Sequence, residues 1–233
     1  MSAFEVAKSP KLDRDFQAEF QGLLQTGQVN AVNHGEFEQA AAQLVHEASV
    51  IDSGLKRAKA LAIQRCRRGG KTFMLHGVAS KLQQTMSLET TRIIFISLNS
   101  ITGYMNGEDA YVALLSRVAW EISGREPKSF LIFRRKYDDY GAVDLWLTSE
   151  GNKVILIVDE LNVIPPTAER YRDMSALLDN FVQQQGCALL YSTHQRSVAD
   201  LLRGRNAGDG NSFQLSKRVH KWVSIPRITR ECC

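Results

Sequence analysis

Cysteine is scarce in this sequence, and no cysteines have the spacing of a metal site or of a disulfide framework. The 233 residues include only Cys66, Cys187, Cys232 and Cys233. Two of these lie inside apolar, strand-like segments, which is typical of reduced thiols in an intracellular protein. The five histidines are equally dispersed, and His46 lacks the second histidine that a zinc-protease helix needs. These absences exclude a zinc cluster or a disulfide scaffold as the basis of the fold.

Long apolar runs are also missing. No segment approaches the roughly 20 apolar residues that cross a bilayer, and residues 1–11 contain no stretch typical of a signal peptide. We therefore expect no membrane partner and a soluble, intracellular chain in the cytoplasm or the nucleus. Secretion as an effector into a host cell stays open.

Neither sign of charge is in large excess. The net charge is +4, and the sequence has no dense stripe of lysine and arginine. Nucleic acid therefore stays open as a partner without being indicated by charge. The composition, 44% hydrophobic and 23% charged, is that of a globular protein, and the length favours one main domain.

What the sequence does have, from residue 61 on, is an alternation of short apolar runs with helical stretches. The runs predict strands near 61–63, 93–98, 154–158, 187–191 and 219–225. The stretches predict helices over 71–84, 108–123, 138–149 and 168–185. Continuous apolar runs suit strands that are covered by helices on both faces. We predict an α/β fold with a mainly parallel, five-stranded sheet in a three-layer arrangement.

A glycine-rich loop follows the first predicted strand and opens the first predicted helix. It reads Arg65-Cys66-Arg67-Arg68-Gly69-Gly70-Lys71-Thr72, which resembles the Walker A pattern of P-loop nucleoside triphosphatases. In such a loop, backbone N–H groups converge on phosphate at a helix N-terminus. The predicted nucleotide-binding residues are Arg67, Arg68, Gly69, Gly70, Lys71, Thr72 and Phe73. Arg65 stands where the pattern has its first glycine, which implies a different loop entry or a weakened site.

Two acids end the strongest apolar run, about ninety residues after the lysine. Asp159 and Glu160 follow Val154–Val158, as in a Walker B motif. The carboxyl ends of parallel strands are where ligands bind in such sheets. We predict that Thr72 and Asp159 hold Mg²⁺ and that Glu160 is the general base for the attacking water. The competing interpretation is that Asp159 only caps the following loop or helix.

The next apolar run ends in the polar residues Ser192 and Thr193. Both are candidates for positioning water between the acids and a terminal phosphate, and of the two we assign Thr193 as catalytic. A strand-end hydroxyl with a purely structural role is the alternative for each.

The order of these motifs resembles the P-loop ATPase domain of Crinkler-type effectors and retrotransposon hot spot proteins, relatives of the AAA+ and STAND ATPases. The likeness rests on Gly-Gly-Lys-Thr, on Ser97-Leu98-Asn99 after a strand, on the helix around Trp120, and on Asp159-Glu160-Leu161-Asn162. It implies a nucleotide-binding role for Lys71 and Thr72, a magnesium aspartate at Asp159 and a catalytic Glu160. It covers about residues 60–226.

These inferences divide the chain into an N-terminal helical extension, 1–57, and a P-loop NTPase domain, 58–233, without the C-terminal helical lid of AAA+ proteins. The expected cofactors are ATP and Mg²⁺. The expected function is ATP hydrolysis that drives a conformational or assembly change, with a homo-oligomer or another protein as partner. A nucleotide-gated or catalytically dead interaction module, and a nucleic-acid-associated effector, remain alternatives.

Overall fold

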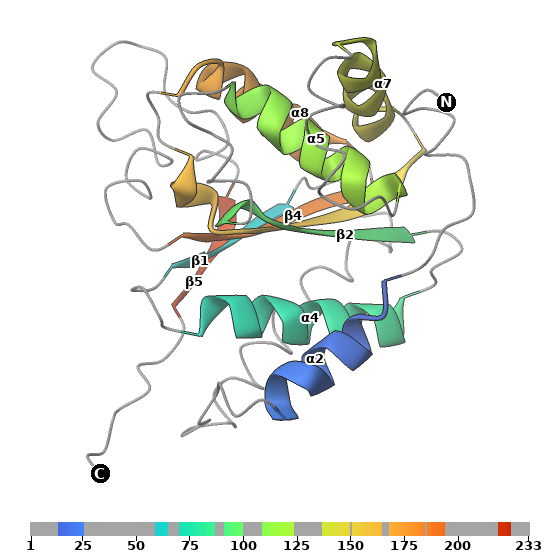
Figure 1. Cartoon of the computed structure of the whole chain (residues 1–233), viewed down its shortest axis with the longest axis vertical. Coiled ribbons are helices and arrows are strands. Elements are labelled where there is room, and N and C mark those ends of the chain that lie inside the picture. The colour runs from blue at the N-terminus through green and yellow to red at the C-terminus, as the bar shows by residue number, and fades with distance from the viewer. Residues whose placement is uncertain are drawn as a thin grey trace.

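The computed structural model of the protein describes residues 14–25, 59–64, 70–86, 91–99, 109–123, 137–149, 151–164, 168–184, 186–193 and 219–224. A central sheet lies between two layers of helices: α5, α7 and α8 cover one face, and α4 with α2 covers the other (Figure 1). We call these the α5 layer and the α4 layer.

The sheet is built from parallel neighbours in the order β2-β3-β4-β1-β5. Its strands are β1 (Lys59–Gln64), β2 (Thr91–Ser97), β3 (Lys153–Asp159), β4 (Cys187–Thr193) and β5 (Val219–Ser224). Every residue of β4 is buried, as is every residue of β3 after Lys153. Such complete burial is expected for strands with helices on both faces. The predicted α/β class and the parallel sheet are confirmed.

The α5 layer contains α5 (Ala110–Ser123), α7 (Tyr137–Leu147) and α8 (Tyr171–Gln183). Asp109 begins α5 as a side-chain cap, because its Oδ1 accepts hydrogen bonds from the backbone N–H groups of Tyr111 and Val112. The large apolar cluster of the molecule forms where these helices meet the sheet, and it includes the fully buried Leu114 and Phe181. This cluster holds α5 and α8 against β2, β3 and β4.

The α4 layer contains α4 (Lys71–Thr85) and α2 (Phe16–Gln25). A smaller apolar cluster lies under this face of the sheet and includes Phe16, Leu75 and Phe95. The backbone N–H of Ala18 donates to Asp15 Oδ1, which caps the start of α2. Residues 14–25 are thus packed directly on α4.

Arg14, just before α2, forms hydrogen bonds that attach this end of α2 to the edge strand β2 and to α5. The Arg14 guanidinium donates to the Phe95 carbonyl at 3.1 Å and to the Glu121 carboxylate of α5 at 3.0 Å. It also pairs with Glu19 at 2.5 Å. Gln83 of α4 adds two hydrogen bonds to α2. Its side-chain oxygen accepts from the backbone N–H of Phe16, and its side-chain NH₂ donates to the backbone carbonyl of Arg14.

Other expectations fall partly outside the described residues. Residues 26–58, and with them the boundary predicted at 57/58, lie outside, so this division of the chain stays a prediction. The described helices include none that is both long and apolar enough to cross a bilayer.

Candidate functional site

The candidate site lies at the edge of the sheet where β3 and β4 end and α4 begins. Gly70 precedes α4 with φ 79° and ψ 13°, a left-handed conformation that favours glycine over residues with a Cβ. Lys71 and Thr72 follow in the first turn of α4, and Lys71 is only 4% exposed. The N-terminus of a helix carries partial positive charge and unpaired N–H groups, so this turn is suited to an anion.

A hydrogen bond joins the two predicted motifs across 87 residues of sequence. The Thr72 hydroxyl donates to Asp159 Oδ2 at 2.7 Å. Asp159 is the last residue of β3 and is 2% exposed. The start of α4 and the end of β3 therefore meet in one place, as the paired motifs require.

Ser192 is the second contact of Asp159. Its hydroxyl donates to Asp159 Oδ1 at 2.5 Å and accepts the backbone N–H of Glu160 at 2.8 Å. Ser192 is completely buried on β4. Of the two hydroxyl residues considered from the sequence, Ser192 is the one that the structure brings to the acidic pair.

Thr193 lies beside Ser192, yet its hydroxyl is placed differently. It is fully buried, and its Oγ1 has no hydrogen-bond partner within the part of the chain that the structure describes. Successive residues of a strand point to opposite faces, so only one of this pair can face the Asp159 carboxylate. The catalytic role assigned to Thr193 stays a prediction.

The chain turns away from the direction of β3 at Glu160, immediately after Asp159. Its backbone has φ 58° and ψ 48°, in the left-handed region, and it precedes the short 3₁₀ helix η4 (Leu161–Val163). Left-handed backbone is uncommon for a residue with a Cβ and is often found at functional sites. The two acids are neighbours in sequence but have different backbone conformations.

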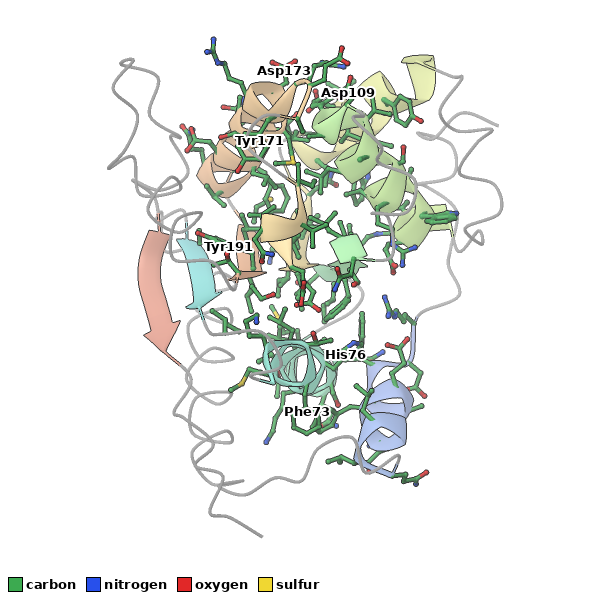
Figure 2. All side chains as sticks on the ribbon, turned by 60° about the vertical axis from the view of Figure 1, so that its left-hand side comes forward. Phe73, His76, Asp109, Tyr171, Asp173 and Tyr191 are labelled. Atoms are coloured by element: carbon green, nitrogen blue, oxygen red, sulfur yellow. The ribbon has the colours of Figure 1, made fainter. Side chains whose placement is uncertain are left out.

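Phe73 is turned toward the N-terminal helix. Its ring packs on Phe20 of α2 with 4.9 Å between the ring centroids. Figure 2 shows Phe73 and His76 on α4, with α2 beside that helix. The Phe73 ring is therefore used in packing on α2, and the predicted role of Phe73 in nucleotide binding would involve its backbone. Arg67, Arg68 and Gly69 lie outside the described residues.

His76 connects the first turns of α4 to α2. Its ring lies 4.3 Å from the Phe95 ring, and its Nδ1 lies 3.5 Å from the Glu19 carboxylate. Burial lowers the pKa of His76, while the Glu19 charge opposes that shift. The contact with α2 was not foreseen from the sequence, although Phe16 and Phe20, four residues apart, are a signal for it.

The residues at this edge fit a magnesium ion and a nucleotide phosphate by their chemistry. Mg²⁺ prefers oxygen ligands, and the Thr72 hydroxyl and the Asp159 carboxylate provide two within hydrogen-bond distance of each other. Lys71 and the first turn of α4 supply the positive charge that phosphate requires.

No protein-family model and no curated protein matches this sequence. Solved structures do match. The ORC1 protein of Aeropyrum pernix in complex with DNA is similar with a TM-score of 0.58 and 16% identity, over 89% of this chain and 49% of that one. The ORC2 protein of Aeropyrum pernix, solved as ADPNP–ADP complexes, has a TM-score of 0.54 and 15% identity, over 84% of this chain and 48% of that one.

Drosophila ORC bound to poly(dA/dT) DNA and Cdc6 is similar with a TM-score of 0.56 and 8% identity, over 91% of this chain and 32% of that one. This chain spans half of these neighbours' length or less. The likeness identifies the fold, which is the α/β P-loop fold of the AAA+ ATPases.

Proposed function

We propose that this protein binds ATP with magnesium and hydrolyses it to drive a conformational or assembly change. The observation that carries the proposal is the hydrogen bond between Thr72 and Asp159, which joins the P-loop helix to the end of β3 in a fold of the AAA+ type. ADPNP and ADP in the ORC2 complexes support a nucleotide as the ligand of such a fold.

Each residue at the site has a distinct task in this proposal. The buried Lys71 and the N–H groups of the first turn of α4 bind and orient the phosphates. Thr72 and Asp159 would hold a magnesium ion through oxygen, and the ion would supply positive charge against the charge that develops on the phosphates. The Glu160 carboxylate accepts a proton from the attacking water.

The test compares Mg-ATP binding and phosphate release in the wild type and two variants. Lys71→Ala removes a charge-assisted contact worth about 1.5–3 kcal/mol, so ATP binding should weaken roughly 10- to 150-fold. Glu160→Gln should keep binding and lower phosphate release by about 10²- to 10⁴-fold. Running GTP beside ATP identifies the preferred base.

Matched controls exist at exposed positions away from the site. Lys81 is exposed on α4 and Glu169 is exposed before α8, so Lys81→Ala and Glu169→Gln make the same chemical changes away from the site. Both controls should bind and hydrolyse ATP like the wild type. Equal ATP binding by wild type and Lys71→Ala would contradict the proposal.

The second candidate function is a nucleotide-gated or catalytically dead interaction module. Arg65 in place of the first loop glycine favours it. In that case the wild type binds Mg-ATP through Lys71 but releases no phosphate, and Glu160→Gln changes nothing.

A nucleic-acid partner is a further proposal, supported by the DNA in the ORC1 and Drosophila ORC complexes. Binding to duplex DNA that weakens steeply as salt is raised supports it, and no binding at low salt contradicts it. The finer likeness to Crinkler-type and retrotransposon hot spot ATPases also remains a proposal, supported by the order of motifs in the sequence.

A further inference from the structure

One buried hydroxyl, that of Ser192, contacts both acids of the site. A serine hydroxyl has one O–H donor and two acceptor lone pairs. Here the donor is used on Asp159 Oδ1, at 2.5 Å, and a lone pair accepts the backbone N–H of Glu160, at 2.8 Å. The orientation of each acid therefore depends on the same side chain.

For Asp159, the consequence is a carboxylate that is held at both oxygens. Thr72 donates to Oδ2 from α4, and Ser192 donates to Oδ1 from β4. Because the two donors lie on different elements, the plane of the carboxylate is fixed between them. Among the described residues, loss of Ser192 leaves the Thr72 hydroxyl as the hydrogen-bond donor to a carboxylate that is 2% exposed.

For Glu160, the consequence is a stabilised turn out of the strand. The ladder between β3 and β4 pairs Val158 with Tyr191 at its carboxyl end. Beyond that pair, the Glu160 N–H bonds the Ser192 side chain instead of a β4 carbonyl, and the Glu160 backbone is left-handed with φ 58°. A buried N–H needs a partner, so the Ser192 hydroxyl favours this conformation over an extended one.

We propose that Ser192 is the positioning residue of the site: through one hydroxyl it sets the Asp159 carboxylate for the metal and the Glu160 backbone for the direction of the general base. The proposal rests on the proposed function and assigns to Ser192 a role separate from that of Thr193. In this role Ser192 acts through its contacts with Asp159 and Glu160.

The first measurement is an equilibrium one that does not depend on turnover. In the Glu160→Gln background, magnesium is titrated against binding of an ATP analogue with a fluorescent ribose label. Adding Ser192→Ala should raise the half-saturating magnesium concentration about 10- to 100-fold, as loss of an outer-shell partner does at metal sites. Nucleotide affinity at saturating magnesium should change little.

The second measurement is turnover in the otherwise wild-type chain. Ser192→Ala should lower kcat about 10- to 100-fold with KM for Mg-ATP nearly unchanged, because the residue orients groups without binding the substrate. Ser192→Thr keeps the hydroxyl and should restore activity toward the wild type. Ser192→Cys keeps the volume with only a weak donor and should behave like Ser192→Ala. This variant decides the question if the alanine variant does not fold.

The control is Ser116→Ala, which removes a hydroxyl that is 1% exposed and bonds the Val112 carbonyl within α5. It should leave magnesium dependence and kcat unchanged. Wild-type values of both quantities in folded Ser192→Cys overturn the positioning role while leaving the ATPase intact. Failure of the wild type to bind Mg-ATP, or equal binding by Lys71→Ala, instead overturns the proposed function.

Discussion

The two faces of the sheet are covered by different means. On the α5 layer, a large and continuous apolar cluster fills the space between three helices and the strands. On the α4 layer the apolar cluster is smaller, and a polar network beside it joins Arg14, Glu19 and His76, with Arg14 also pairing with Glu121 of α5. Apolar burial therefore holds the α5 layer, while specific polar contacts help to attach α2 to α4, to β2 and to α5.

Charged residues occur in the α5 layer too, but they lie at its rim. Arg170 pairs with Asp109 at the start of α5 and with Asp173 at the start of α8. Figure 2 shows Asp109 and Asp173 on the side of the sheet away from His76. By contrast, the Arg14 network reaches the backbone of the edge strand, where burial raises the pKa of the Glu121 carboxyl despite two nearby arginines. The following substitutions test this contrast.

The largest effect is expected in the α5 layer. Phe181→Ala empties a fully buried position on α8, and loss of such an aromatic side chain typically costs about 3–5 kcal/mol. The measurement is the free energy of unfolding in urea. Leu145→Ala in the same layer is the control, because Leu145 is 63% exposed and its loss should change stability by less than about 0.5 kcal/mol.

The next effect is in the α4 layer. Arg14→Met keeps the apolar stem but removes the guanidinium from Glu121 and from the Phe95 carbonyl. Breaking a buried pair can cost about 3–5 kcal/mol, and the 31% exposure of the Arg14 side chain reduces our expectation to about 2 kcal/mol. Urea unfolding measures this value.

The double variant Arg14→Met with Glu121→Gln separates the charge from the packing. It removes the carboxylate left without its partner and should recover part of the loss. An Arg14→Met variant as stable as the wild type would show that α2 is held by apolar contacts alone.

A smaller effect distinguishes two helical glycines. A Cβ added at Gly22 on α2 would meet nothing within 4 Å, so Gly22→Ala should stabilise by about 0.5–1 kcal/mol through helix propensity. A Cβ at Gly77 on α4 would lie 3.2 Å from the Phe20 ring, and Gly77→Ala should lose that gain because Phe20 must shift. Thermal unfolding of both variants tests whether α2 packs as closely as described.

The smallest effect is a dependence of stability on pH. Burial lowers the pKa of His76 below its ordinary value of 6.5, so the unfolded chain binds a proton more readily than the folded one. The stability contributed by neutral His76 is therefore fully present above about pH 6.5, the ordinary pKa. It is lost as the pH falls from that value toward the lower pKa of the folded state. Urea midpoints at pH 7.5, 6.5 and 5.5 should fall in the wild type and change less in His76→Gln. If the urea midpoints of the two proteins fell by the same amount with pH, the pH dependence would come from a group other than His76.

Most of the central fold could be predicted from the sequence because its signals are local. Val154–Val158 is a continuous apolar run, and every one of these residues is buried in β3. The predicted helix 71–84 differs by a single residue from α4, and 168–185 exceeds α8 by a few residues at its ends. Helix ends depend on caps and turns, such as the left-handed Arg170 before α8, which apolar periodicity does not indicate.

The details of the site and the position of α2 depend on contacts between distant segments. Whether Ser192 or Thr193 faces Asp159 is set by the register of β4 against β3, which a strand pattern alone does not fix. The left-handed backbone of Glu160 likewise follows from a bond to another strand. α2 buries Phe16 against Phe95 of β2 and against α4, and because these segments are far apart in sequence, local periodicity does not indicate this packing.

The packing of α2 on α4 has a practical consequence for expression of the α/β domain without the N-terminal residues. A fragment beginning at residue 58 would lose Arg14, Phe16 and Phe20 together, and water would then reach the rings of Phe73 and Phe95 that they cover. An apolar surface exposed in this way on α4 and β2 promotes aggregation. Crystallographers and enzymologists who seek a minimal soluble unit should therefore start it upstream of Arg14.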